Sequence, residues 1–133
     1  METVSAALLW EMFKHARQWL TNLRRAGQER KLQSRQAVRR IITAARETAV
    51  YVRQLEETGK RDHHTEKHLS LKWTELGFEL EDLGIKELAE KCQIKGKHWS
   101  DPNYYQPDFF KKADVSLDRM EQLAQAILNE TDR

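Results

Sequence analysis

Five large apolar side chains recur at intervals of four, three, four and three residues, namely Leu69, Trp73, Leu76, Leu80 and Leu83. This spacing places them along one side of an α-helix and is typical of helices in a bundle or a coiled coil. A half-buried strand would alternate apolar and polar residues instead, so the pattern excludes a β-strand here. Asp62 stands where its carboxylate can accept the free amide hydrogens of a first helical turn. We therefore expect a helix over 62–83.

The same rhythm extends over most of the chain. Apolar residues three or four positions apart predict four further helices, over 4–26, 28–58, 85–96 and 116–130. The apolar stripe of helix 28–58 is expected to consist of Val38, Ile41, Ala45, Ala49, Val52 and Leu55. Gly59 and Gly96 stand where helices 28–58 and 85–96 are expected to end. Only two prolines and five glycines occur in 133 residues, and good helix formers dominate the remainder. The chain is therefore predicted to be all-α, with no β-sheet.

These elements fit a single helical domain over 1–133, because a chain of this length supports one core. We expect a bundle of four to five helices in which 28–58 and 62–83 form a long antiparallel hairpin, with helix 4–26 packed along it. The intervening stretch 97–115 holds both prolines and is expected to be a loop that closes one end.

Charge and cysteine content bound the class of protein. No uncharged apolar run approaches the roughly 20 residues needed to cross a bilayer, so we expect no membrane span. Cys92 is the one cysteine, cannot form an internal disulfide and lies on an apolar helix face, where it is expected to act as a small buried hydrophobe. No secretory signal pattern opens the chain, so we expect a cytoplasmic protein.

The charges are distributed unevenly. Residues 1–53 carry a net charge of +7 (11 Lys and Arg against 4 Asp and Glu), and residues 54–133 carry −5 (12 against 17). On helix 28–58, four arginines fall within about 40° of one another on a helical wheel, namely Arg35, Arg39, Arg46 and Arg53.

This arginine row has three interpretations. Guanidinium groups bind phosphates and carboxylates through paired hydrogen bonds, so the row fits either a nucleic acid or an acidic protein partner. The third interpretation is internal: an antiparallel hairpin brings the row toward the acids of helix 62–83, namely Glu75, Glu79 and Asp82.

Two features of the predicted hairpin indicate a partner. Leu71 and Phe78 lie seven residues apart on a second face of helix 62–83, and the stretch 28–37 has only Leu32 to bury. A monomer is expected to expose both regions, so we expect a homodimer or another protein to cover them. The residues proposed for this contact are Leu32, Arg35, Arg39, Arg46, Leu71 and Phe78.

Five aromatic residues stand in the segment 97–115: Trp99, Tyr104, Tyr105, Phe109 and Phe110. Aromatics among lysines can stack on the bases of single-stranded nucleic acid. They can also contact a peptide, or plug the end of a helical bundle, where each aromatic side chain buries about 150–250 Å².

No arrangement of residues predicts a cofactor or a metal. His63, His64 and His68 form the one dense group of possible ligands, but one helix face supplies too few of them for a structural zinc. The spacing of Arg61, Asp62 and His68 resembles the active-site motif of HEPN ribonucleases, in which the arginine and the histidine act at RNA phosphates. In that family the motif lies on a late helix, whereas here it precedes a mid-chain helix.

With no nucleophile in a recognisable motif, the sequence favours a non-enzymatic protein-interaction module that self-associates or docks on a larger assembly. An RNA- or DNA-binding module and a HEPN-like ribonuclease are the alternatives.

Overall fold

The computed structural model describes residues 21–23, 25–113 and 115–131. Within them the chain forms helices and no strand, which confirms the predicted all-α bundle. The helices are α2 (Gln28–Thr58), α3 (His63–Asp82), α4 (Lys86–Ser100), α5 (Pro107–Ala113) and α6 (Leu117–Thr131). Residues 21–23 are helical, and the rest of the helix predicted over 4–26 lies almost entirely outside the described residues.

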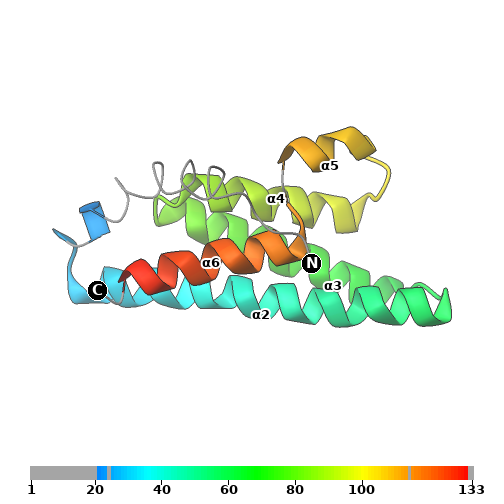
Figure 1. Cartoon of the computed structure of the whole chain (residues 1–133), viewed down its shortest axis with the longest axis horizontal. Coiled ribbons are helices and arrows are strands. Elements are labelled where there is room, and N and C mark those ends of the chain that lie inside the picture. The colour runs from blue at the N-terminus through cyan, green and yellow to red at the C-terminus, as the bar shows by residue number, and fades with distance from the viewer. Residues whose placement is uncertain (1–20, 24, 114, 132–133) are drawn as a thin grey trace.

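Helices α2 and α3 form a long antiparallel hairpin (Figure 1). α2 ends at Gly59, whose φ of 67° is in the left-handed region that favours glycine, and the Gly59 amide donates to the Leu55 carbonyl. Asp62 then begins α3, because its carboxylate accepts a hydrogen bond from the His64 amide at 3.2 Å. The predicted start and end signals therefore produce the tight connection.

The core lies where α2, α3, α4 and α6 meet. Trp73 is its largest fully buried side chain, and its indole Nε1 donates to Thr48 Oγ1 at 2.9 Å. Thr48 in turn donates to the Ala44 carbonyl at 2.7 Å, so both polar groups are satisfied inside the core. All five residues of the predicted 4-3-4-3 repeat are buried.

Helix α4 packs closely on α3 because Gly96 has no side chain. A Cβ atom on Gly96 would lie 3.0 Å from both the Ser70 carbonyl oxygen and the Thr74 amide nitrogen of α3, and closer still to the Thr74 hydroxyl. Ser70 uses the short distance, since its hydroxyl donates to the Gly96 carbonyl at 2.8 Å. Gly96 was expected to end its helix, but it lies inside α4, where it lets the helix pack closely on α3.

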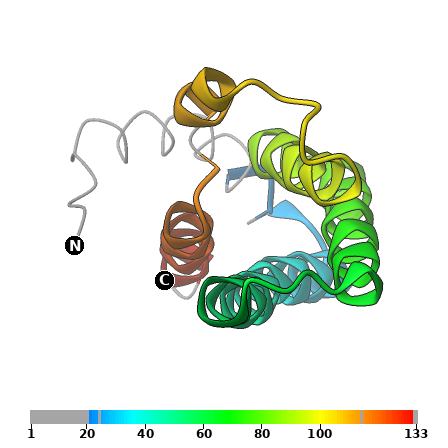
Figure 2. The ribbon, with the colours of Figure 1, turned by 90° about the vertical axis from the view of Figure 1, so that its right-hand side faces the viewer.

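Helix α6 returns along α2 and buries one side against it (Figure 1). Its buried residues are Arg119, Met120, Leu123, Ala124, Ile127 and Leu128. Seen from the end of the hairpin, α4, α5 and α6 all lie on one side of the layer formed by α2 and α3 (Figure 2).

Three expectations need correction. The segment 97–115 is not a continuous loop: α4 extends to Ser100, and 107–113 form α5. The first turns of α2 are only partly uncovered: residues 28–33 are exposed or half-buried, as expected, whereas Ser34 and Ala37 are buried. Finally, the buried stripe of α2 does not run through Ala49, which is exposed.

Among the described residues, no helix combines the length and apolarity that a bilayer span requires.

Candidate protein-interaction surface

The arginine row of α2 does not pair with the acids of α3. Arg46 Nε donates to Glu121 of α6 at 2.8 Å, and Arg35 donates to the hydroxyl of Thr131 at the end of α6. Arg39 and Arg53 are exposed and have no hydrogen-bond or ion-pair partner among the described residues. The internal interpretation is therefore wrong for the row, half of which bonds to α6 instead.

Another set of charges joins the two helices along their outer seam. Arg40, which the sequence did not single out, pairs with Glu79 of α3. Two turns further along α2, Glu47 accepts hydrogen bonds from Lys72 and His68. The bond from Lys72 holds the pKa of the Glu47 carboxyl below its usual value, so it stays ionised.

The outer face of α3 exposes two large apolar side chains. Leu71 is 52% and Phe78 is 57% exposed, whereas the repeat from Leu69 to Leu83 faces the core. Helical geometry places the acids Glu75 and Asp82 in the same stripe, within about 60° of these two residues. Both acids are exposed and have no partner among the described residues.

The outer face of α2 has the same character with the opposite charge. Leu32 is 53% and Val50 is 56% exposed, and Arg39 and Thr43 lie within about 40° of them on the helical wheel. Val50 was absent from the residues expected at a contact, although its spacing of 18 residues from Leu32, five helical turns, was available in the sequence.

The aromatic residues near α5 form a connected cluster. Tyr105 stacks on Phe109 with centroids 4.5 Å apart, and Phe110 contacts His98 edge to face at 4.7 Å. Trp99 extends the cluster into the bundle, where it contacts Tyr51 of α2 at 5.6 Å. Lys97 lies over the ring of Tyr104, which is 59% exposed.

Several titratable groups of α4 have shifted pKa values. Burial lowers the pKa of Lys95 to about 8 and raises that of Cys92 to about 12, so the thiol is unreactive at neutral pH. Burial and the neighbouring Lys95 also lower the pKa of His98. The ring nitrogens His98 Nδ1 and Trp99 Nε1 are buried without a hydrogen-bond partner in the described part of the chain.

A buried carboxylate near the hairpin turn explains the role of Arg61. Glu66 accepts two hydrogen bonds from Arg61, at 2.8 and 3.0 Å, and one from the Tyr51 hydroxyl at 2.6 Å. The bonds from Arg61 lower the pKa of Glu66, and burial together with Glu66 raises the pKa of Tyr51. The sequence could have located Glu66, because it lies one helical turn before Leu69 in the buried stripe.

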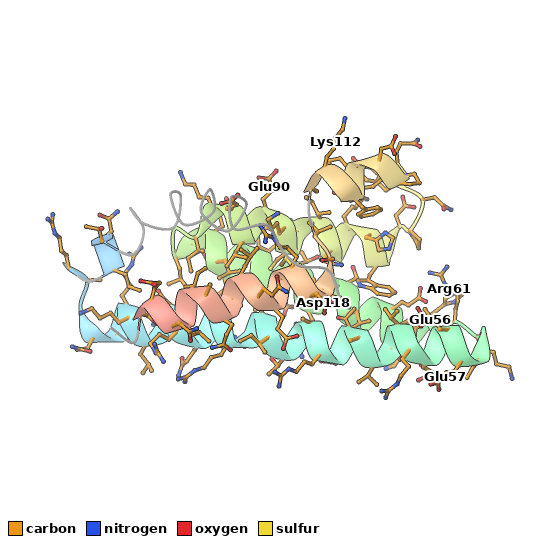
Figure 3. The ribbon with its side chains drawn as sticks, viewed as in Figure 1. Glu56, Glu57, Arg61, Glu90, Lys112 and Asp118 are labelled. Atoms are coloured by element: carbon orange, nitrogen blue, oxygen red, sulfur yellow. The ribbon has the colours of Figure 1, made fainter. Side chains whose placement is uncertain are left out.

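The HEPN-like residues are therefore engaged within the chain. Arg61 projects from the hairpin end toward the side of α4 and α5 (Figure 3), where it bonds to Glu66, and His68 bonds to Glu47 in the seam. His63 and His64 stand beside them in the first turn of α3. In the part of the chain that the structure covers, no group of three or more His, Cys, Asp or Glu side chains is placed to hold a metal ion.

Comparisons with protein-family models, with curated proteins and with solved structures found no match to this chain.

Proposed function

We propose that this chain is a helical protein-interaction module that binds its partner through the outer faces of α2 and α3. The observation that carries this proposal is the exposure of Leu71 and Phe78 on one side of a helix whose other side is fully buried. An outer helix face that only met water would be expected to be polar. Two large apolar groups among charges are typical of a protein contact.

The chemistry of the surface supports binding rather than catalysis. Glu66 and Lys95, which have perturbed pKa values, lie within the bundle, and Glu47, which lies in the seam of this face, is already bonded to Lys72 and His68. What the face offers a partner is apolar area with unpaired arginines on α2 and unpaired acids on α3 among the described residues. Such charges steer association and select the partner.

Site-specific photo-crosslinking in cells that express the chain tests this proposal. Phe78 and, in a separate variant, Leu71 are each replaced by a photoreactive phenylalanine analogue. Glu90, which projects from α4 away from the hairpin (Figure 3), is replaced in the same way as a control. A discrete protein adduct is expected at position 78 and not at position 90. If neither position 78 nor 71 gives an adduct beyond the level of the control, the outer faces are not an interaction surface.

Nucleic-acid binding is the second candidate function. Its support is that Arg39 and Arg53 are unpaired among the described residues and that Lys97 lies beside exposed Tyr104. Phosphate contacts make affinity fall steeply with salt. Fluorescence anisotropy with single-stranded and duplex oligonucleotides at low and high salt decides it, because an absence of salt-dependent binding at micromolar protein would remove this candidate.

A further inference from the structure

The partner of this surface can be inferred from its charges. The stripe on α2 contains Arg39 with Leu32 and Val50, and the stripe on α3 contains Asp82 and Glu75 with Leu71 and Phe78. Between the levels of Leu32 and Val50 the charges of the α2 stripe are positive, and between those of Leu71 and Asp82 the charges of the α3 stripe are negative. Nearer the hairpin turn each stripe continues with one charge of the other sign, Glu57 on α2 and Lys67 on α3. A surface of this kind is complementary to a second copy of itself.

Both stripes face the same side of the molecule. Val50 precedes Tyr51, which contacts α3 through Glu66, and Leu71 precedes Lys72, which contacts α2 through Glu47. Each stripe thus lies about 100° around its helix from the side that meets the other helix. Because the helices are antiparallel, these equal offsets turn both stripes to one side of the layer. Helices α4 and α6 lie on the other side of the layer (Figure 2).

The levels along the hairpin then determine which residues would meet. Thr48 and Trp73 are hydrogen-bonded across it. Val50 lies two residues after Thr48, and Leu71 lies two residues before Trp73, so these two residues are at the same level of the antiparallel hairpin. Arg39 lies nine residues before Thr48, and Asp82 lies nine residues after Trp73, so they share a second level. Rotation by 180° about an axis parallel to the hairpin moves no residue along that axis, so the same residues would be level across a dimer.

We propose that two copies of the chain associate through this surface about a two-fold axis parallel to the hairpin, so that α2 of each copy packs antiparallel on α3 of the other. In this arrangement Val50 contacts Leu71 of the second copy, and Arg39 pairs with Asp82 of the second copy. Phe78 lies at the level of Thr43, whose short side chain leaves room for a ring. Each contact occurs twice.

The available area is enough for a specific dimer. α3 has 20 residues and is therefore about 30 Å long, and two packed helices present a face about 20 Å wide. Each copy would bury about 600 Å², close to the lower limit for a specific interface. The ion pairs of the seam, Arg40 with Glu79 and Glu47 with Lys72, lie at the axis and are already paired within each copy.

A charge-reversal experiment on the full chain tests the register. Light scattering at about 100 μM is expected to give twice the chain mass of 15.8 kDa for the unchanged protein. Arg39→Glu and Asp82→Arg each place like charges together at both contacts, so each variant alone is expected to be monomeric. Mixed in equal amounts they are expected to form a dimer, because both contacts then join opposite charges. Glu90→Arg, on the outer side of α4, is the control and should not change the mass.

Three outcomes would overturn the proposal: a monomer for the unchanged chain, dimers for both single variants, or no dimer in the mixture while circular dichroism shows both variants folded. The proposal depends on the proposed function, but the two can fail separately. If the chain is monomeric and position 78 crosslinks to a different protein, the interaction module stands and the two-fold dimer does not. If the chain is monomeric and gives no adduct, both are wrong.

Discussion

At the scale of single residues, the buried carboxylate of Glu66 shows how a polar group can hold a helical hairpin together. Its hydrogen bonds link Tyr51 of α2 with Arg61 at the turn, so it joins three segments. Arg61 holds the pKa of Glu66 below the usual 4.5. A carboxyl with a lowered folded pKa stabilises the fold above its unfolded pKa, and that contribution is lost as the pH falls through the folded value.

We expect Glu66→Gln to lower the free energy of unfolding by about 1–3 kcal/mol at pH 7, because an uncharged amide bonds less strongly to Arg61. Urea denaturation at pH 7 and at a pH low enough to protonate Glu66 measures the effect, and the difference between the two proteins should shrink at the acid end. Glu90→Gln, at an exposed position of α4, is the control. A loss that is the same at both pH values would mean that the charge of Glu66 does not contribute.

The charge of Lys95 is expected to destabilise the fold, whereas the charge of Glu66 stabilises it. Burial lowers its pKa from 10.5 to about 8, so between these values the unfolded chain binds more protons than the folded chain, and stability from this group rises with pH. Cys92 acts in the other direction above its usual pKa of 9, because its folded pKa is about 12. Replacing Lys95 alone separates the two groups.

We expect Lys95→Met to stabilise the fold by about 1 kcal/mol at pH 7, a value reduced for partial solvent screening. This advantage over the unchanged protein should shrink between pH 8 and pH 10.5, as Lys95 loses its charge. Denaturation midpoints across that range are the measurement, with Lys86→Met, at an exposed position of α4, as the control. A variant that is less stable than the unchanged chain at pH 7 would show that the ammonium group has a favourable partner.

At the scale of elements, the contact between α3 and α4 depends on Gly96. Alanine normally stabilises a helix by about 1 kcal/mol relative to glycine, but here its methyl group would meet backbone atoms of Ser70 and Thr74. At Gly77 the obstruction is the flexible end of Gln93, which can move. We expect Gly96→Ala to cost about 1–3 kcal/mol and Gly77→Ala to be close to neutral. Equal denaturation midpoints for the two variants would contradict a close helix contact at Gly96.

The helices themselves could be predicted from the sequence more reliably than the side they bury. α2 occupies the range expected for it, because the apolar rhythm and Gly59 are local signals. Its buried stripe passes through Ala44, Thr48 and Tyr51 instead of Ala49. Apolar periodicity could not show this, because Thr48 and Tyr51 carry hydroxyl groups whose hydrogen-bond partners, Trp73 and Glu66, lie on another helix.

The apolar part of the proposed interaction surface could be predicted from a local pattern, but the partners of its arginines could not. Leu71 and Phe78 stand out as a second apolar face within a single helix, and both are exposed in the structure. The partners of the arginines depend on which helix lies beside α2, and α6 takes that place for Arg46. Short-range patterns contain no information about a helix that returns from the far end of the chain.

At the scale of the whole molecule, the segment containing α5 is expected to be the least stable described part. α5 has seven residues, fewer than an isolated helix needs, and it is held by the edge contact of Phe110 on His98 and by Lys91, which donates to the Ala113 carbonyl at 2.5 Å. The buried nitrogens of His98 and the adjacent Trp99, which have no partner among the described residues, weaken this docking, because buried polar atoms without partners cost free energy.

Hydrogen exchange followed by mass spectrometry should therefore show two levels of protection. The amides of 107–113 are expected to exchange through local opening, whereas those of α3 around Trp73 should exchange only on global unfolding. Phe110→Ala should remove the remaining protection of 107–113 and leave that of α3 nearly unchanged, since the core of α2, α3, α4 and α6 does not include α5. Protection of 107–113 equal to that of α3 would mean that the aromatic cluster folds as part of the core, and then Phe110→Ala should destabilise the entire bundle.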